Sequence, residues 1–133
     1  MLFDTSIWID YLKNVSSEET ALLDFELVRY KNIQAEICPP IYQEILQGIR
    51  TDVEYERIKE LLRTINFLTL DGYFAAEGGA RIYRELRKKG ITIRKPNDCI
   101  IAFYAIHFDL PLAHNDSDFE KIAKHTALKV YKK

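Results

Sequence analysis

The chain has 133 residues, of which 47% are apolar and 29% are charged, and its formal net charge at pH 7 is −1. This length predicts one domain over residues 1–133, with enough apolar residues for a core that needs no staple. The near-zero net charge excludes a protein that is basic overall, but it leaves room for a local basic patch.

The first residues lack the basic stretch and the long apolar run of a signal peptide, and no apolar run approaches the ~20 residues that span a bilayer. Cys38 and Cys99 lie in apolar stretches and show no zinc-ligand spacing, so we expect both to be reduced core residues. These features predict a cytoplasmic protein without membrane association.

Short apolar segments alternate with longer helical patterns, which is typical of βαβ units and a mostly parallel sheet. We expect strands at 1–3, 33–38, 65–70, 112–113 and 128–131, which gives a five-stranded sheet in an α/β fold. We expect helices after Thr5-Ser6, over about 18–30, from Pro39-Pro40 to about 50, over about 53–63 and 74–89, from Pro96-Asn97, and from Ser117, where Ser117 to Glu120 has capping-box spacing.

The helix that starts near Pro96 is apolar on every side, as its stretch CIIAFYAI shows. Such a helix is normally buried, so the residues that open it lie against the core. Those residues are Asn97 and Asp98.

Several other acids stand where apolar strands end. Asp4 follows the first strand, and Asp116 and Asp118 follow the strand at 112–113. Ligands of open α/β sheets bind beyond the carboxyl ends of the strands, so these acids converge if their strands are neighbours. Converging carboxylates repel one another unless a cation relieves them, and an all-carboxylate set without His or Cys favours Mg²⁺ or Mn²⁺.

Each acid also has a purely structural explanation. Asp4 could cap a helix or form an ion pair, Asp98 could stabilise a helix N-terminus, and Asp116 or Ser117 could cap the last helix. Glu44 falls well off the apolar face of its helix, so the pattern alone favours a solvated glutamate. Spacing alone leaves these alternatives open.

Four stretches, in this order, resemble the PIN-domain ribonucleases and specifically the VapC-type toxins of bacterial toxin–antitoxin pairs. They are FDTSIWIDYL, PPIYQEILQGI, IRKPNDCIIAFYAI and LPLAHNDSDFEKIA, and the resemblance spans nearly the whole chain. It implies a PIN-like three-layer α/β/α fold and an acidic pocket that holds Mg²⁺ or Mn²⁺ and cleaves RNA.

The resemblance also assigns site residues. The family acids match Asp4, Glu44, Asp98 and Asp116, so we follow the motif for Glu44 against the pattern. Asp118 is a further acid that would bind a second ion or support the other ligands. Thr5 or Ser6 would hydrogen-bond a ligand or a metal-bound water.

The implied reaction is hydrolysis by metal-activated water, in line with the leaving oxygen, at one or two ions. Such a route needs no 2′-hydroxyl nucleophile, so we expect 5′-phosphate and 3′-hydroxyl ends. The implied partners are RNA, with tRNA or rRNA as known family targets, a cognate VapB-like antitoxin that fills a groove near the N-terminal helices, and a second copy in a homodimer. No residue identifies the RNA.

Basic residues near the acids are candidates for RNA contact. Arg84, in the run of Arg81, Arg84 and Arg87, shares one broad helix face with its neighbours, and Arg94 and Lys95 precede Asn97 and Asp98. We expect some of them to hold the RNA backbone, and the alternative is a solvated helix face. His114 adjoins the acids, and we favour a structural role for it.

Three rival functions compete with the toxin. An aspartate-nucleophile phosphatase needs a second Asp two residues after the first, and Ser6 stands there instead. A non-catalytic PIN-fold binding module and a PIN nuclease of RNA processing outside toxin–antitoxin systems both stay open.

Overall fold

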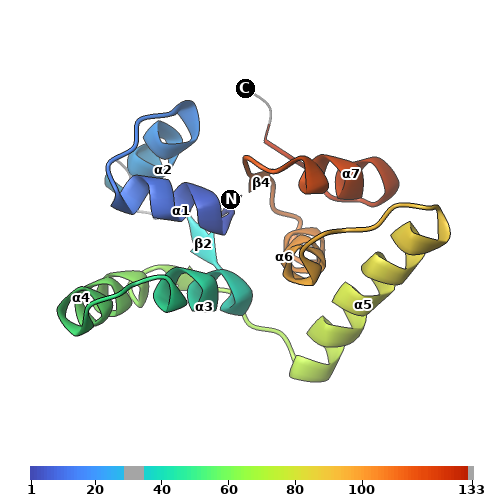
Figure 1. Ribbon diagram of the computed structural model, residues 1–133, viewed down its shortest axis with the longest axis horizontal. Helices are drawn as coiled ribbons and strands as arrows, with labels where there is room; N and C mark the ends of the chain where they lie inside the picture. Colours follow the sequence, from blue (N-terminus) through green and yellow to red (C-terminus); the bar gives the residue numbers. More distant parts are fainter. Residues whose placement is uncertain (29–34, 132–133) are drawn as a thin grey trace.

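The computed structural model describes residues 1–28 and 35–131, and Figure 1 shows how their helices and strands are arranged. The elements in chain order are β1 (Leu2–Phe3), α1 (Thr5–Leu12), α2 (Glu18–Val28), β2 (Glu36–Ile37), α3 (Pro39–Gln47), α4 (Asp52–Leu62), β3 (Asn66–Phe67), α5 (Gly72–Lys88), α6 (Pro96–His107), β4 (Leu112–Ala113) and α7 (Ser117–His125). The predicted alternation of strands and helices is therefore confirmed.

The strands form one parallel sheet in the order β3-β2-β1-β4. Leu2 of β1 lies opposite Glu36 of β2 on one side and opposite Leu112 of β4 on the other. This order makes β1 and β4 neighbours, so the chain segments that follow them leave the sheet side by side.

The expected fifth strand at 128–131 is wrong, because the sheet of the described residues has four strands. Val130 forms only an isolated bridge with Leu112, although Leu112 donates to the carbonyl of Lys129 at 2.9 Å and accepts from Tyr131 at 2.8 Å. The segment follows β4 for too short a distance to become a strand. Residues 33 and 34 of the expected strand 33–38 lie outside the described residues.

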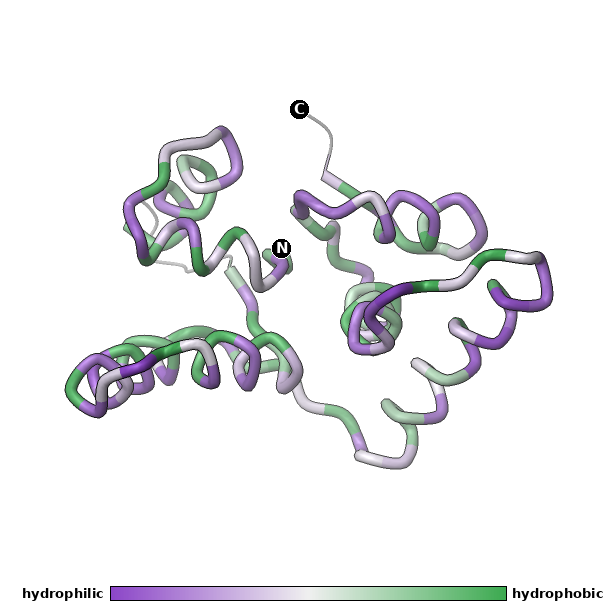
Figure 2. Tube along the Cα trace, in the orientation of Figure 1, coloured by the Kyte–Doolittle hydropathy of each residue, from purple (hydrophilic) through white to green (hydrophobic). Residues whose placement is uncertain are grey.

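In the view of Figure 1, α1 to α4 lie on the left and α5 to α7 on the right, with β2 and β4 toward the middle. Helix α6 is buried along most of its length, as its apolar sequence predicts. Gly78 and Gly79 of α5 let it approach α6, because a Cβ at either position would lie within 2.6 Å of Phe103 or Ile100 side-chain atoms. Figure 2 shows the outer helices α4, α5 and α7 alternating between hydrophilic and hydrophobic residues.

One predicted helix start needs correction. The expected caps Thr5-Ser6 lie inside α1, and the N-cap residue is Asp4, whose side chain makes no capping hydrogen bond. The predicted start of α7 at Ser117 is confirmed, and of the two possible caps, Asp116 and Ser117, the N-cap is Asp116, whose carboxylate accepts from the amide of Asp118. Both aspartates thus stand at the junction of a strand and a helix.

Both cysteines have the burial and the reduced state that the sequence predicts. Cys38 and Cys99 are buried and free. Within the described ranges, no helix combines the length and apolar character needed to cross a membrane.

Candidate active site

Asp4 stands at the carboxyl end of β1, where it is 7% exposed. Its amide donates to the carbonyl of Ala113 at 2.9 Å, which continues the pairing of β1 with β4 beyond the strand. Its side chain does not cap α1, and Oδ2 accepts from the hydroxyl of Ser6 at 3.0 Å. The carboxylate is thereby held at the end of the sheet, among residues that follow β4.

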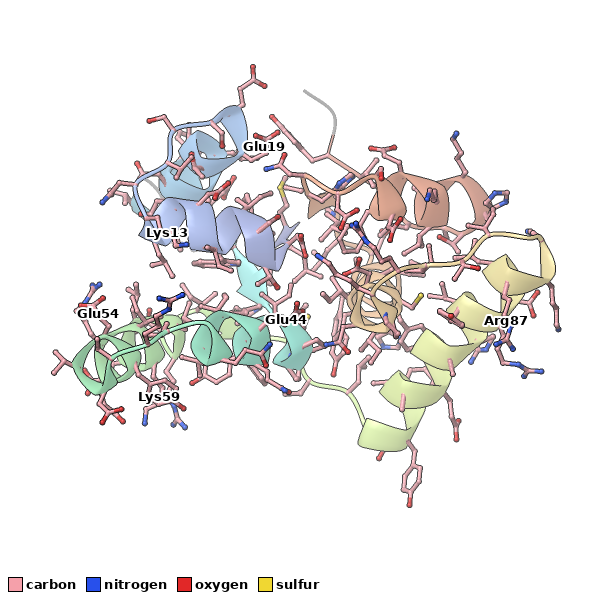
Figure 3. The ribbon with its side chains drawn as sticks, in the orientation of Figure 1. Lys13, Glu19, Glu44, Glu54, Lys59 and Arg87 are labelled. Atoms are coloured by element: carbon pink, nitrogen blue, oxygen red, sulfur yellow. The ribbon has the colours of Figure 1, made fainter. Side chains whose placement is uncertain are left out.

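Two further carboxylates come from helices. Asp98 lies in the first turn of α6 and is 3% exposed, because the helix it opens is packed in the core. Glu44 lies on α3, and Figure 3 shows it toward the middle of the molecule, between α3 and α6. Its Oε1 atom is buried, so the expectation of a fully solvated glutamate is wrong.

We call Asp4, Glu44 and Asp98 the inner carboxylates, and repulsion between their charges adds to the effect of burial on the pKa values of Glu44 and Asp98. Burial raises the pKa of Asp98 to about 7, with added repulsion from Asp4, Asp116 and Glu44. Burial and the charge of Asp4 raise the pKa of Glu44, and burial raises the pKa of Asp4. The structure therefore brings three sequence-distant acids within electrostatic reach of one another.

The inner carboxylates are short of hydrogen-bond donors. Oε1 of Glu44 and Oδ2 of Asp98 are buried without a hydrogen-bond partner among the described residues. The hydroxyl of Thr5 lies close enough to Glu44 to oppose the rise of its pKa, but Oγ1 is outside hydrogen-bonding geometry and is itself buried and unpartnered. Buried charged oxygens without partners are costly, so the pocket favours a cation.

We call Asp116 and Asp118 the α7 carboxylates, and both have hydrogen-bond donors and basic side chains beside them. Oδ1 of Asp116 accepts from the amide of Asp118 at 3.0 Å, and its Oδ2 faces the side chains of Arg94 at 3.5 Å and Lys95 at 3.7 Å. Although burial acts in the opposite direction, the amide of Asp118 and the charges of Lys95 and Arg94 lower the pKa of Asp116. Asp116 completes the pocket of the inner carboxylates through its repulsion with Asp98.

Asp118 has both oxygens engaged by the protein. Its Oδ2 accepts from the amide of Arg94 at 3.1 Å, and its Oδ1 pairs with Nζ of Lys121 at 3.3 Å. The side chain thus ties the loop before α6 to α7, which fits the supporting role better than that of a metal ligand. Sequence reasoning missed Lys121, for which the three-residue spacing from Asp118 on one helix face was the available signal.

The basic residues divide into two groups. Burial raises the pKa of Asp4, Glu44 and Asp98, and the charge of Lys95 opposes this rise in all three. Lys95 also helps to lower the pKa of Asp116, so it belongs to the pocket. The arginines of α5 are exposed on the outer helix, where Figure 3 shows Arg87 far from Glu44.

Arg84 lines a hollow of about 330 Å³ between α5 and α6 with Pro96 and Ile100, and none of the acids. Asn97 is exposed in the first turn of α6, beside Asp98. The structure therefore separates Arg84 from the acids, and it leaves Asn97 next to them in the chain.

The donor set fits a hard divalent cation. Carboxylate oxygens are the ligands that Mg²⁺ and Mn²⁺ prefer, and Glu44 and Asp98 each have a buried oxygen free for one. Across residues 1–28 and 35–131, no three His, Cys, Asp or Glu side chains already converge as a finished metal site.

A second hollow lies apart from the acids, between α1, α3 and α4. It measures about 490 Å³, and its apolar lining includes Ile9, Leu12, Ile45, Ile49 and Ile58. Lys13, Arg50 and Arg57 stand among the polar residues of this lining. Glu54, also in the lining, pairs with Arg57 at 2.7 Å, so among the described residues two of these basic side chains remain for an acidic partner. A groove of apolar residues with basic neighbours is suited to an amphipathic peptide that carries acids.

Comparison with known proteins places the chain in a family. Residues 1–125 match the PIN domain. The chain is 35% identical over 132 residues to the VapC ribonuclease Mb1587 of Mycobacterium bovis and to ribonuclease VapC11 of Mycobacterium tuberculosis, covering 96% of this chain and 95% of each relative.

Solved structures share the fold. VapBC2 from Rickettsia felis, bound to a DNA fragment from its promoter, aligns with a TM-score of 0.74 at 17% identity and covers 98% of this chain and 96% of that one. VapBC-1 from nontypeable Haemophilus influenzae aligns with a TM-score of 0.70 at 23% identity and covers 98% and 95%. With a matching domain model and close VapC relatives over nearly its full length, the chain belongs to the PIN-domain family, among the VapC ribonucleases.

Proposed function

We propose that the protein is a metal-dependent endoribonuclease and the toxin of a toxin–antitoxin pair. The observation that carries this proposal is the pocket of buried carboxylates at the ends of β1 and β4, with two unpartnered oxygens on Glu44 and Asp98. The identity to VapC ribonucleases supports the choice of RNA as substrate. Buried acids without compensation are costly, and a binding module without catalysis has no use for them. The carboxylates therefore favour the nuclease over a non-catalytic binding module.

Asp4, Glu44 and Asp98 would hold Mg²⁺ or Mn²⁺, with Asp116 as a fourth ligand. When bound, the ion neutralises these charges, activates a water and stabilises the charge that develops on the phosphodiester. The hydrogen bond from Ser6 fixes one oxygen of Asp4. Burial in the core holds Asp98 in place against the repulsion of its neighbours.

Lys95 and Arg94 are the residues we assign to the RNA backbone. Their side chains are 58% and 71% exposed, yet both approach Oδ2 of Asp116. They can therefore neutralise an incoming phosphate at the edge of the pocket, where a purely acidic surface would repel it. Arg84 lies elsewhere and is a weaker candidate.

The decisive test is RNA cleavage by the purified chain with Mn²⁺ or Mg²⁺, compared with Asp98→Asn and Asp4→Asn. We expect cleavage that needs the ion, leaves 5′-phosphate ends and falls at least ~100-fold in either variant. An intact RNA with the unmutated protein at saturating Mn²⁺ would reject the nuclease. Mapping RNA ends in cells after induction, with Asp98→Asn as control, would then identify tRNA, rRNA or another target.

The groove between α1, α3 and α4 is our candidate site for the antitoxin. A solved structure from Klebsiella pneumoniae that covers 89% of this chain with a TM-score of 0.66 is a toxin–antitoxin complex, which supports a VapB-like partner for this chain. We expect Leu12→Arg to abolish co-purification with the product of a small neighbouring reading frame and to leave RNA cleavage intact. Co-purification at the wild-type level would move the antitoxin to another surface, and the lack of any such partner would favour a nuclease of RNA processing.

A homodimer is part of the same proposal. The resemblance to the family supports it, and sedimentation of the purified chain at micromolar concentration measures it directly. A monomer would remove this element and leave the nuclease untouched.

A further inference from the structure

His114 stands between β4 and α7, and both of its ring nitrogens are engaged. Nδ1 accepts from the backbone amide of Asp116 at 3.1 Å, and Nε2 lies 3.2 Å from Oε1 of Glu120. The ring packs against Phe119 with 5.4 Å between centroids, and the side chain is only 8% exposed.

These contacts define the form of the imidazole. A backbone amide only donates, so Nδ1 carries no proton and the proton of the neutral ring is on Nε2. Nε2 then donates to Glu120, whose carboxylate only accepts. The ring is thus a rigid connection from the first turn of α7 to the backbone of Asp116.

The backbone of Asp116 sets the direction of its carboxylate. Its amide is bound by His114 and its Oδ1 by the amide of Asp118, so the remaining oxygen, Oδ2, is the one that faces Arg94 and Lys95 at the pocket. Without the bond to Nδ1, the amide of Asp116 would need another acceptor, and the residue could turn.

We propose that His114 is a positioning residue that holds Asp116 in the orientation needed for a metal ligand. This inference rests on the proposed function, and it deepens that function by naming a residue outside the carboxylate set. If the ring served only to pack against Phe119, neither ring nitrogen would need a hydrogen-bond partner. Groups that orient the ligands of a metal are typically worth ~10-fold or more in affinity.

Three substitutions separate the two nitrogens from the packing. Asparagine carries an oxygen where histidine carries Nδ1, so His114→Asn keeps an acceptor for the amide of Asp116. Glutamine reaches the place of Nε2, so His114→Gln keeps the contact with Glu120 only. His114→Phe keeps the ring against Phe119 and has no nitrogen.

The experiment measures Mn²⁺ binding to the full chain and its variants by calorimetry, with melting temperatures in the absence of metal. We expect His114→Phe and His114→Gln to bind Mn²⁺ ~10-fold more weakly than the unmutated chain and His114→Asn to stay within ~3-fold. Equal affinity in the unmutated chain and His114→Phe, or equal losses in His114→Asn and His114→Phe, would overturn the role of His114. An unmutated chain that binds no Mn²⁺ would instead overturn the proposed function.

A metal-free measurement keeps the test valid if a variant is unstable. In ¹⁵N spectra of the unmutated chain at pH 7.5, we expect His114 to show an unprotonated Nδ1 and a protonated Nε2. A proton on Nδ1 would exclude the bond to Asp116 and with it the proposal.

Discussion

The two sides of the acidic pocket differ in how their charge is compensated. The inner carboxylates Asp4, Glu44 and Asp98 have raised pKa values, and two of their oxygens are buried without a hydrogen-bond partner in the part of the chain that the structure describes. The α7 carboxylates are bound by backbone amides, and lysine or arginine side chains lie beside them. The protein therefore compensates one side itself and leaves the other to be compensated from outside.

This difference sets Asp118, whose two oxygens are both engaged by the protein, apart from the three inner carboxylates. A buried carboxylate with donors on each oxygen stabilises the fold, whereas one without them destabilises it. Removing a carboxyl charge should consequently have opposite effects on the two sides. Stability measurements without metal test this contrast more directly than activity does, because activity needs both sides.

Asp118→Ala is expected to give the largest change. It removes the acceptor for the amide of Arg94 and the partner of Lys121, and the side chain is only 6% exposed. Leaving a buried amide unsatisfied costs about 2 kcal/mol, so we expect the free energy of unfolding to fall by that amount in urea denaturation. Asp118→Asn keeps an acceptor for the amide, and should lose less than half as much. A gain of stability in Asp118→Ala would erase the contrast between the two sides.

Asp98→Asn should act in the opposite direction. It removes the charge that burial and the neighbouring acids disfavour, so we expect the metal-free chain at pH 8 to gain about 1 to 2 kcal/mol in its free energy of unfolding. Asp52→Asn, at an exposed position in the first turn of α4, is the control and should change stability by less than about 0.5 kcal/mol. Destabilisation by Asp98→Asn alone would show that the carboxylate is compensated after all.

The pH dependence of the free energy of unfolding tests the direction of the effect of Asp98. The pKa of Asp98 is raised from 3.8 in the unfolded chain to about 7 in the folded one, so the folded state holds the proton more tightly. Its contribution to stability is present below pH 4 and is lost as the pH rises toward and through 7. As the pH rises from 4 to beyond 7, we expect the free energy of unfolding of the metal-free chain to fall more than that of Asp98→Asn. Urea denaturation at each pH measures both.

Much of this architecture follows from the sequence, for definite physical reasons. The apolar segments at 1–3 and 112–113 predict buried strands, because strands of a parallel sheet are covered on both faces. The sequence left open whether these two strands are neighbours, and the structure shows that β1 and β4 are. Helix α6 is apolar on every side, which predicts both its burial and that of Asp98. The segment at 128–131 has the composition of a strand, but composition does not fix how many residues stay paired.

The site was harder to predict, and Glu44 shows why. A helical pattern gives the direction of the apolar face, marked by Ile41 and Ile45, and does not show what packs beside that face. Helix α6 packs against α3, so a glutamate off the apolar stripe comes within electrostatic reach of Asp98. The convergence of the acids depends on such contacts between distant segments, and only the family motif could indicate it in advance.

Lys95 offers the smallest and sharpest test, because it lies between the two sides. Its charge lowers the pKa of Asp4 and Asp98 and pairs with Asp116. It is also 58% exposed, so solvent screens its effect and limits it to about 1 kcal/mol. Lys95→Gln should make the pocket more negative and bind Mn²⁺ ~3- to 5-fold more tightly, as measured by calorimetry.

The same substitution should weaken RNA cleavage by raising KM, because a phosphate loses its cation at the edge of the pocket. Arg84→Gln is the matched control: it also removes one positive charge, but from the hollow between α5 and α6, away from the acids. We expect it to leave Mn²⁺ affinity within ~1.5-fold, because Arg84 is exposed, so solvent and salt screen its charge, and no acid lines its hollow. If only Lys95→Gln binds the metal more tightly and RNA more weakly, this lysine offsets the charge of the acids until the substrate arrives. If both substitutions have equal effects, the pocket responds only to the overall charge of the protein.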